Sequence, residues 1–511
     1  MKELIFAFSL ALSASAADLS AVPPVMDCAQ LKSLDLSAVA DTPIHITDSV
    51  KMEDGKPAPY CKITGYVEPH VQFEVRLPLA GWTQRFLETG CGGLCGHTDV
   101  HVSNAGSCVS AQRGELALAG TDMGHEGPGG DFGDDPQLRI DFAYRGVHVT
   151  ALTAKALIAK YYGQAAKYSY FAGCSDGGRE ALMEAQRFPN DFDGITAGAP
   201  AMNFITQNSF YHGWNARVNT DAAGQAILTS NQLPILHAAA VAACGGKDGL
   251  IADPRTCHFD PAVTQCKAGD DPKTCLTAEQ VAAARKIYQG AHDEQGHKFV
   301  ISGPQVGSEL AWRGVYIPNR PEQRVMSAQI STDTIKHLLY DKPLPASYTL
   351  ADFRFDTDTF AGIKQMHSLY DATNPDLTAF AAHGGKLILW HGWSDPHISP
   401  LNTIAYYSAV KQFMGVEKAK QFARLYLFPG GYHCGGGEGP FDVDLLSPIM
   451  AWVENQSAPN ELTAKNAKMT SSIAPYSFDL QPRDQPDWLG AEFYRVPVAA
   501  GASPKFKKVN E

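Results

Sequence analysis

The sequence has no hydrophobic run long enough to cross a lipid bilayer. An apolar stretch at its start, Leu4–Leu12, falls well short of the ~20 residues that a membrane-spanning helix requires. Basic charge is also scarce, because 42 Lys and Arg stand against 54 Asp and Glu and no basic cluster interrupts the acidity. The net charge of -12 argues against a nucleic-acid partner, which would select a basic face. We therefore expect neither a membrane nor a nucleic-acid partner.

Internal repeats and low-complexity tracts are absent as well, which excludes a repeat architecture. What remains is the composition of an ordinary globular protein, with 44% hydrophobic and 19% charged residues. At 511 residues the chain is too long for one ordinary core. We therefore expect either two domains or one large domain with an insertion.

Residues 1–16 have the features of a secretory signal peptide. Lys2 precedes the apolar run, and Ala14-Ser15-Ala16 matches an A-x-A cleavage site. The alternative is an N-terminal strand or helix of the fold. Export to a secreted or periplasmic location would allow disulfides to persist, and the chain has 11 cysteines. Because that number is odd, at least one thiol stays free or pairs between chains.

The most informative motif is Gly173-Cys174-Ser175-Asp176-Gly177, which matches G-x-S-x-G. The preceding residues, Tyr168–Ala172, are typical of a short buried strand, and Arg179–Gln186 is typical of a helix. A strand that turns sharply into a helix presents the serine hydroxyl at the top of a parallel sheet, as in the nucleophile elbow of α/β-hydrolases. The alternative, a chance match in a glycine-rich chain, is disfavoured by these flanks.

Strand-like and helix-like segments alternate on both sides of this motif. Strand patterns occur at Val71–Leu77, Glu115–Ala119, Phe192–Gly198, Lys386–Trp390 and Arg424–Phe428, and a helical pattern runs from Thr150 to Tyr162. This alternation predicts an α/β fold, an α/β-hydrolase sheet with helices on both faces. Residues 17–60 show little periodicity. The alternation stops between residues 203 and 378, which we predict to be a lid domain inserted into a catalytic domain of residues 17–202 and 379–511.

A serine nucleophile needs a general base, and the base needs an orienting acid. In α/β-hydrolases these follow in the order Ser, acid, His. Asp395 follows a predicted strand, and His433 lies on a glycine-rich loop after the next one. The alternatives are an ordinary turn aspartate and a structural histidine, and the rival bases His391 and His397 come too early in the order. We predict Ser175, Asp395 and His433 to be a catalytic triad.

Two backbone N–H groups should bind the oxyanion that forms during ester cleavage. One should belong to Asp176, the residue after the predicted nucleophile. The other should come from the glycine-rich loop Gly90–Gly96, with Gly92 as the first choice and Gly93 as the second. The alternative for this loop is a plain glycine turn held by cysteines.

Cysteines adjoin both the predicted nucleophile and the predicted base. Cys174 precedes Ser175, and Cys434 follows His433. A disulfide between them would fix the separation of the two catalytic loops and would close a very long loop of chain, where the effect on the unfolded state is largest. The alternative is a pair of separate buried thiols.

With these motifs the chain resembles the tannase and feruloyl esterase family. In that family a disulfide joins a Cys-Ser elbow to a His-Cys loop, and an Asp between them in sequence completes the triad. Cys174-Ser175, Asp395 and His433-Cys434 match this pattern. Further matching stretches are Gly120–His125, Asp141–His148 and Arg187–Pro200, and the likeness runs from about residue 25 to 455. The resemblance implies a secreted serine esterase with a large lid.

The resemblance also implies a set of disulfides. In addition to Cys174–Cys434 these are Cys28–Cys61, Cys244–Cys257 and Cys266–Cys275. Three cysteines remain, Cys91, Cys95 and Cys108, of which any two are free to pair.

A calcium loop is usual in the lid of this family, but the present chain departs from it. The stretch Cys244–Asp253 is shorter than the family pattern, and only Asp248 lines up with a calcium ligand. Calcium requires about six to eight oxygens, several of them from carboxylates. Zinc at Cys91 and Cys95 is also not expected, because no C-x-x-C pair recurs elsewhere. We expect no required cofactor, and a structural calcium only if Asp248 still belongs to a calcium loop.

The resemblance implies hydrolysis of a small aromatic ester, of the kind found in plants, with a feruloyl, other hydroxycinnamoyl or galloyl acyl group. The lid should supply the pocket for the ring, and Leu310–Tyr316 has side chains suited either to that pocket or to the core of the lid. A second hypothesis is hydrolysis of terephthalate monoesters by the same triad. A third, a non-catalytic binding protein of the hydrolase fold, is disfavoured because all three triad residues stand in order.

Overall fold

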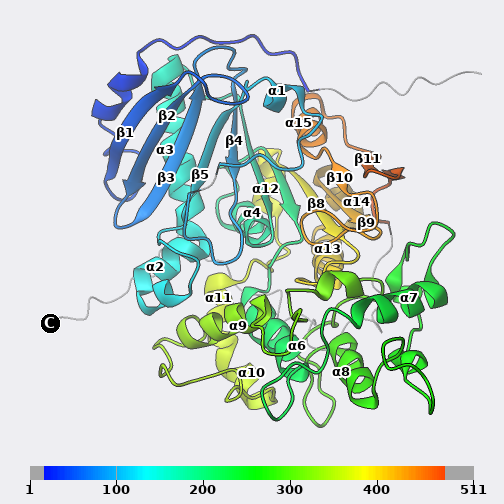
Figure 1. The fold of residues 1–511 in the computed structure, drawn as a ribbon. Helices are drawn as coiled ribbons and strands as arrows, with labels where there is room; N and C mark the ends of the chain where they lie inside the picture. The colour runs from blue at the N-terminus through cyan, green and yellow to red at the C-terminus, as the bar shows by residue number, and fades with distance from the viewer. Residues whose placement is uncertain (1–15, 99, 478–511) are drawn as a thin grey trace, which may run out of the picture.

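The computed structural model describes residues 16–98 and 100–477 (Figure 1). Residues 1–15 of the predicted signal peptide and the end of the chain from residue 478 lie outside this description. Within the described residues, no helix is long and apolar enough to span a membrane.

Nine strands form one sheet in the order β1-β2-β3-β5-β4-β6-β7-β8-β9. Their bounds are Ile44–Met52 (β1), Tyr60–Val67 (β2), Val71–Pro78 (β3), Arg85–Thr89 (β4), Ala117–Thr121 (β5), Tyr168–Cys174 (β6), Gly194–Gly198 (β7), Lys386–Gly392 (β8) and Ala423–Phe428 (β9). Neighbours from β5 to β9 run parallel, whereas β1, β2, β3 and β5 pair antiparallel. A small second sheet holds Asp442–Val443 (β10), Leu462–Lys465 (β11) and Thr470–Ile473 (β12). The predicted α/β fold is confirmed.

One strand lies where the sequence showed little periodicity. β1 belongs to the stretch 17–60 and forms the edge of the sheet. A register shift between Ile46 and Asp48 moves successive side chains out of strict alternation, and most of the strand is exposed. A bulged edge strand therefore loses the alternating pattern by which strands are recognised.

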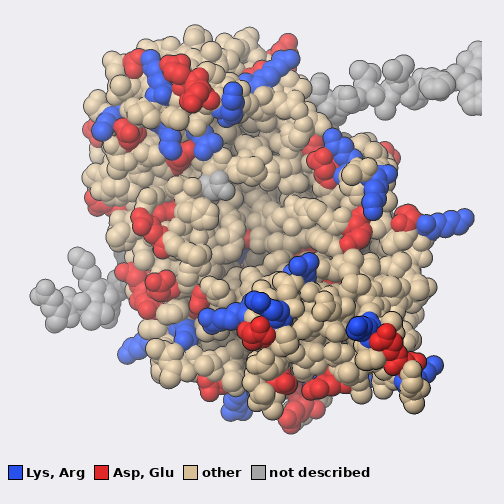
Figure 2. All heavy atoms as spheres, viewed as in Figure 1, with Lys and Arg blue, Asp and Glu red and all other residues tan. Residues whose placement is uncertain are grey.

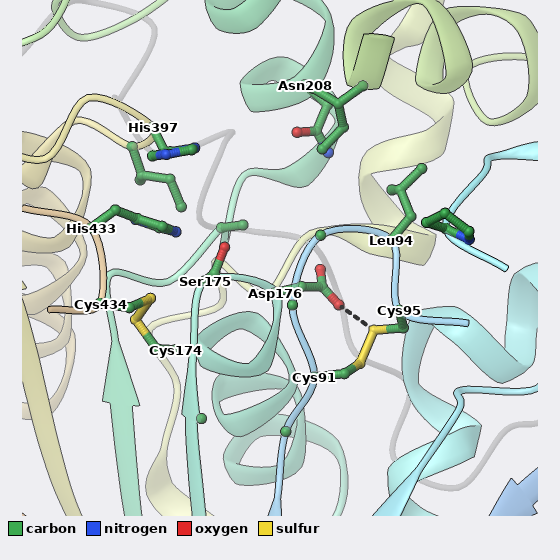
Figure 3. Close-up of a pocket in the computed structure, with 18 of the residues that line it drawn as sticks. Cys91, Leu94, Cys95, Cys174, Ser175, Asp176, Asn208, His397, His433 and Cys434 are labelled. Atoms are coloured by element: carbon green, nitrogen blue, oxygen red, sulfur yellow. Dashed lines mark hydrogen bonds between the residues drawn. A yellow bond between two sulfur atoms is a disulfide. The ribbon is translucent and has the colours of Figure 1, made fainter. Parts of the chain in front are cut away.

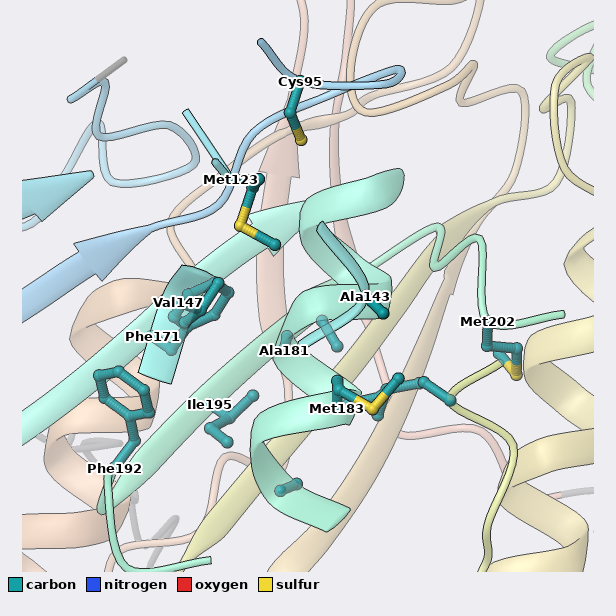
Figure 4. Close-up of a cluster of buried hydrophobic side chains, with 14 of the residues drawn as sticks. Cys95, Met123, Ala143, Val147, Phe171, Ala181, Met183, Phe192, Ile195 and Met202 are labelled. Carbon is teal, nitrogen blue, oxygen red and sulfur yellow. The ribbon is translucent and has the colours of Figure 1, made fainter. Parts of the chain in front are cut away.

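Helices cover both faces of the sheet. The helices that belong to the sheet-forming parts of the chain are Val109–Gln112 (α1), Pro136–Ile140 (α2), Gly146–Tyr162 (α3), Asp176–Arg187 (α4), Pro400–Met414 (α13), Val416–Phe422 (α14) and Leu446–Asn455 (α15). Alternate side chains of one strand point to opposite faces, so Phe171 packs in the core under α3 and α4, while Tyr170 packs under α15. Figure 4 shows the first of these cores, where Phe171, Val147 and Ala181 lie between β6, α3 and α4.

The chain between β7 and β8 is helical and adds no strand to either sheet in the described structure. We call residues 203–378 the helical segment. Its helices are Phe204–Thr206 (α5), His212–Val218 (α6), Leu233–Cys244 (α7), Ala278–Gln289 (α8), Met326–His337 (α9), Thr357–Ile363 (α10) and His367–Tyr370 (α11), and Thr378–His383 (α12) leads back into β8. It lies beyond the carboxyl ends of the parallel strands (Figure 1). Trp312 and Tyr316 are buried in a small separate core of this segment, so Leu310–Tyr316 serves its packing.

Five disulfides join described cysteines: Cys28–Cys61, Cys91–Cys95, Cys174–Cys434, Cys244–Cys257 and Cys266–Cys275. The pairing that the sequence left open is therefore Cys91 with Cys95. Cys108 is a buried free thiol, and burial raises its pKa. A thiol that holds its proton is a poor nucleophile, which favours a packing role for Cys108.

The carboxyl group of Glu88 is an unusual feature of the core beneath the active-site loops. Glu88 is the fourth residue of β4, is fully buried, and neither of its oxygens has a hydrogen-bond partner in the described structure. Burial, with added repulsion from Asp191 and Glu180, raises its pKa well above the ordinary value. The folded protein therefore keeps a proton on Glu88 that the unfolded chain releases above about pH 4.3.

We expect Glu88→Gln to make the free energy of unfolding less dependent on pH. Because the folded pKa is raised, Glu88 makes the wild type less stable as pH rises from about 4.3 toward that folded pKa, by up to ~1.4 kcal/mol per pH unit. Gln cannot titrate, so the variant should gain stability relative to wild type between pH 5 and pH 8. Urea unfolding at the two pH values measures this gain. Glu417→Gln, at an exposed position, is the control, and equal pH dependence in wild type and Glu88→Gln would contradict the prediction.

Candidate active site

Ser175 lies at the sharp turn between β6 and α4. Its backbone has φ 66° and ψ -120°, a conformation that residues with a side chain rarely adopt. The turn is possible because its flanks are glycine: a Cβ atom on Gly173 would lie 2.2 Å from the carbonyl oxygen of Gly177, and one on Gly177 would lie 2.9 Å from that of Cys91. The local geometry is that of a nucleophile elbow, with the side chain of Ser175 presented at the carboxyl edge of the sheet.

Asp395 and His433 meet at the same edge. Asp395 follows β8 and His433 follows β9, and the two parallel strands are neighbours. The Nδ1 atom of His433 lies 2.7 Å from Oδ2 of the fully buried Asp395, and Nε2 of His391 lies 3.0 Å from the same oxygen. The other oxygen, Oδ1, accepts hydrogen bonds from the backbone N–H groups of His397 and Ile398 at 2.7 and 3.1 Å. Both oxygens of this carboxylate are therefore held by hydrogen bonds, which fix its orientation toward His433.

The electrostatics of Asp395 favour its ionised form. Burial by itself raises the pKa of the carboxyl group, but the charge of His433 and the hydrogen bond from His391 hold the pKa well below its usual range. An ionised carboxylate at this distance holds the imidazole of His433 in one orientation. His391, a rival base in the sequence, is therefore engaged by Asp395.

The disulfide Cys174–Cys434 joins the loop of Ser175 to the loop of His433. Its Cα atoms are 5.9 Å apart and its cysteines are 260 residues apart in sequence. Figure 3 shows Ser175 and His433 pointing into the same cavity directly above this bond. The covalent link limits how far the two loops can separate, which a nucleophile and its base require.

A cavity of about 590 Å³ opens above Ser175, between the sheet and the helical segment. Its lining includes Ser175, His433, Gly92 and Leu94 from the sheet side, and Asn208, His212, Met326, Gln329, Ile330 and Asp333 from the helical segment. This volume lies within the ~300–1,000 Å³ of typical small-molecule sites. The cavity therefore has room for a small organic ester beside the serine.

The predicted oxyanion donors border this cavity. Asp176 is the first residue of α4, where backbone N–H groups have no partner within the helix. Gly92 and Gly93 lie opposite, on a loop that the Cys91–Cys95 disulfide and a 2.7 Å hydrogen bond from Gly177 N–H to the Cys91 carbonyl hold against the start of α4. A Cβ atom on either glycine would meet open space, so nothing covers this side of the loop.

Comparison with known proteins adds to this geometry. A family model described as tannase and feruloyl esterase matches residues 57–486. The chain belongs to the tannase and feruloyl esterase family. Family membership makes it a carboxylic ester hydrolase, as predicted.

The esterase is similar to several individual proteins. It is 31% identical to an uncharacterised esterase of Xanthomonas campestris, over 88% of this chain and 84% of the relative. It is also 31% identical to the mono(2-hydroxyethyl) terephthalate hydrolase of Piscinibacter sakaiensis, over 79% and 78% of the two chains. The crystal structure of feruloyl esterase B from Aspergillus oryzae superposes with a TM-score of 0.73 at 25% identity, covering 88% of this chain and 96% of that one.

Two further histidines of the esterase lie beside His433. The ring of His397 stacks on that of His433 with centroids 4.4 Å apart (Figure 3). His212 contacts His397 from the helical segment. Burial and the charge of His433 lower the pKa of His397 well below its ordinary value and that of His212 to about 3. Both rings are therefore neutral at working pH. Sequence reasoning rejected His397 as the base and gave no sign of His212.

The residues considered for metal binding are engaged elsewhere. Asp248 accepts a hydrogen bond from the backbone N–H of Leu250, inside the loop that Cys244–Cys257 closes. Asp253, the other carboxylate near the end of this stretch, pairs with Arg255. The sulfur atoms of Cys91 and Cys95 bond to each other, so they are not thiolate ligands. In a second cluster, the side chains of His148, Glu184 and Asp191 lie close enough together to be ligands of one ion. The two carboxylate oxygens of Asp191 already lie 2.6 Å from Nδ1 of His148 and 3.9 Å from the ammonium group of Lys155. The loop around Asp248 therefore does not offer the several free carboxylates that calcium requires, and the bonded sulfur atoms do not offer zinc a thiolate.

Proposed function

We propose that the protein is a secreted serine esterase that hydrolyses small esters of aromatic acids, with feruloyl, other hydroxycinnamoyl or galloyl acyl groups. The observation that carries this proposal is the 2.7 Å contact between the buried Asp395 and His433, which lines the same 590 Å³ cavity as Ser175. Family membership and the likeness to feruloyl esterase B support the aromatic acyl group. The apolar start of the chain and the five disulfides support export.

In the proposed mechanism, the hydroxyl oxygen of Ser175 attacks the ester carbonyl carbon. His433 accepts the hydroxyl proton, and Asp395 stabilises the resulting imidazolium. The backbone N–H groups of Asp176 and Gly92 donate hydrogen bonds to the negative oxygen of the tetrahedral intermediate. His433 then gives its proton to the departing alcohol, and an acyl group remains on Ser175. Water, deprotonated by His433, attacks this acyl-enzyme and releases the acid.

Residues 203–378 are proposed to be the lid of this site. Asn208 and His212 near the start of the segment and the helix α9 near its end line the cavity above Ser175. A wall built from a separate segment can change between relatives without disturbing the triad, because the triad residues follow strands of the sheet. Acyl specificity is therefore assigned to this segment.

The test uses purified, oxidised protein and three esters: methyl ferulate, methyl gallate and monomethyl terephthalate. We expect turnover of at least one of the first two. An alkyl fluorophosphonate should release fluoride, add its phosphonyl group to the peptide that contains Ser175, and abolish hydrolysis in proportion to labelling. Turnover of none of the three esters by well-folded protein, or labelling of a different residue, would overturn the proposal. Preferential turnover of the terephthalate ester would favour the second candidate, which the likeness to the Piscinibacter hydrolase supports.

A further inference from the structure

The cavity above Ser175 is short of positive charge. None of the described residues that line it is Lys or Arg, and two carboxylates are present, those of Asp176 and Asp333. Asp176 is buried and accepts two hydrogen bonds, of 2.7 and 2.9 Å, from the guanidinium group of Arg179. The positive charge of Arg179 therefore neutralises the negative charge of Asp176. Figure 2 shows the hollow between the sheet and the helical segment in which this cavity lies. Histidines apart, the charge that a substrate meets in it is therefore set largely by Asp333.

Asp333 belongs to the wall that the helical segment contributes. Met326, Gln329, Ile330 and Asp333 are spaced three and four residues apart on α9, so they share the helix face that lines the cavity. The backbone of α9 at Asp333 packs against Gly130, where an added Cβ atom would lie 3.0 Å from it. Helix packing therefore fixes where the backbone and Cβ atom of Asp333 lie.

The carboxylate of Asp333 has no ion-pair or hydrogen-bond partner among the described residues. Other charged groups act on it only from a distance: Asp131 repels it, and His337, Lys336 and Arg324 attract it. An ionised carboxylate without a partner on the wall of a binding cavity can repel a negatively charged ligand and can accept a hydrogen bond from a ligand hydroxyl group.

We propose that Asp333 is a specificity-determining residue of this esterase. Its carboxylate disfavours substrates whose aromatic ring carries a second, ionised carboxyl group, and it favours neutral rings with hydroxyl groups, which can donate a hydrogen bond to it. The inference rests on the proposed function and refines it, because hydroxycinnamoyl and galloyl esters are neutral and hydroxylated, whereas a terephthalate monoester is an anion. A wall residue that acts on ligand charge changes the relative rates of two esters and leaves the triad unaltered.

The decisive comparison uses two esters with the same ring and different charge. Monomethyl terephthalate is an anion and dimethyl terephthalate is neutral. We expect wild type to have the higher kcat/KM for dimethyl terephthalate, and Asp333→Asn to raise the anionic-to-neutral ratio about tenfold. Because burial raises the pKa of Asp333, the assay is run at pH 8, where the carboxylate is ionised, and discrimination should weaken as pH falls. Gln329→Glu, which adds an acid to the same helix face, should lower the ratio.

The matched control is Asp131→Asn. Asp131 lies close enough to Asp333 to act on it electrostatically but lines a separate hollow with His70 and His125. It should leave the ratio within about twofold of wild type. An unchanged ratio in Asp333→Asn, with kcat/KM for the neutral ester retained, would overturn the inference.

Binding provides a readout that does not depend on turnover. In an inactive Ser175→Ala background, equilibrium dialysis of the two esters should show that Asp333→Asn tightens binding of the anion relative to the neutral ester. Equal effects on both esters would contradict the role of Asp333. Absence of wild-type turnover of methyl ferulate, methyl gallate and monomethyl terephthalate would instead contradict the proposed function, so the two failures are distinguishable.

Discussion

Ser175→Ala is expected to reduce kcat for every ester substrate by about 10⁵- to 10⁶-fold. Removal of the hydroxyl group leaves no nucleophile for acyl transfer, and the remaining groups can only bind the substrate and polarise its carbonyl. The side chain of Ser175 makes no contact that the fold requires, since its backbone conformation is held by the glycines around it. The variant should therefore unfold at the wild-type temperature and should bind substrate with nearly unchanged affinity.

Ser103→Ala is the control for this measurement. Ser103 lines the same cavity but lies outside the triad, and its replacement should change kcat by less than about fivefold. Residual ester cleavage by Ser175→Ala at a tenth of the wild-type rate would mean that another group attacks the carbonyl carbon.

Asp395→Asn is expected to lower kcat by about 10⁴-fold with little change in KM. Asn has nearly the same shape as Asp but only one acceptor oxygen. The backbone N–H groups of His397 and Ile398 favour that oxygen on their side, so the NH₂ group would face His433 and could not stabilise an imidazolium. Four hydrogen-bond donors surround the buried carboxylate and stabilise its negative charge, which the substitution removes. His433 would then adopt the tautomer that cannot accept the proton of Ser175.

Steady-state kinetics at pH 7 to 9 measure this effect, since the loss should persist at every pH at which wild type is active. Asp358→Asn, at an exposed position on α10, is the matched control and should have wild-type kinetics. A loss of less than about tenfold in Asp395→Asn would show that another carboxylate orients His433.

The candidate triad could be predicted from sequence because each member sits at a position that chain order constrains. A G-x-S-x-G motif between a strand and a helix locates the serine, and the next strands locate the acid and the base. The cysteines adjoining Ser175 and His433 added a constraint that is independent of strand prediction, and the structure joins them. The parallel neighbours β6 to β9 were predictable because buried strands are short apolar runs.

The cavity wall could not be predicted in the same way. Asn208, His212 and Asp333 belong to helices of the helical segment that no motif marks. The spacing of Met326 and Asp333 on α9 is compatible with a helix face packed on a core, and sequence does not tell a core face from a cavity face. The stacking of His397 on His433 is likewise a property of two loops that meet only after folding.

The sequence by itself determined the fold class and the positions of the candidate triad residues along the chain, because these depend on local periodicity and on short motifs with strict backbone requirements. The links between Cys174 and Cys434 and within the other predicted pairs came from the family resemblance that those motifs revealed. Only the tertiary structure decided that Cys91 pairs with Cys95, that His391 is engaged by Asp395, and that Asp333 faces the cavity without a partner. Those features depend on distances between segments far apart in the chain. Such distances are set by how helices and loops pack against the sheet, a global property that no local pattern encodes.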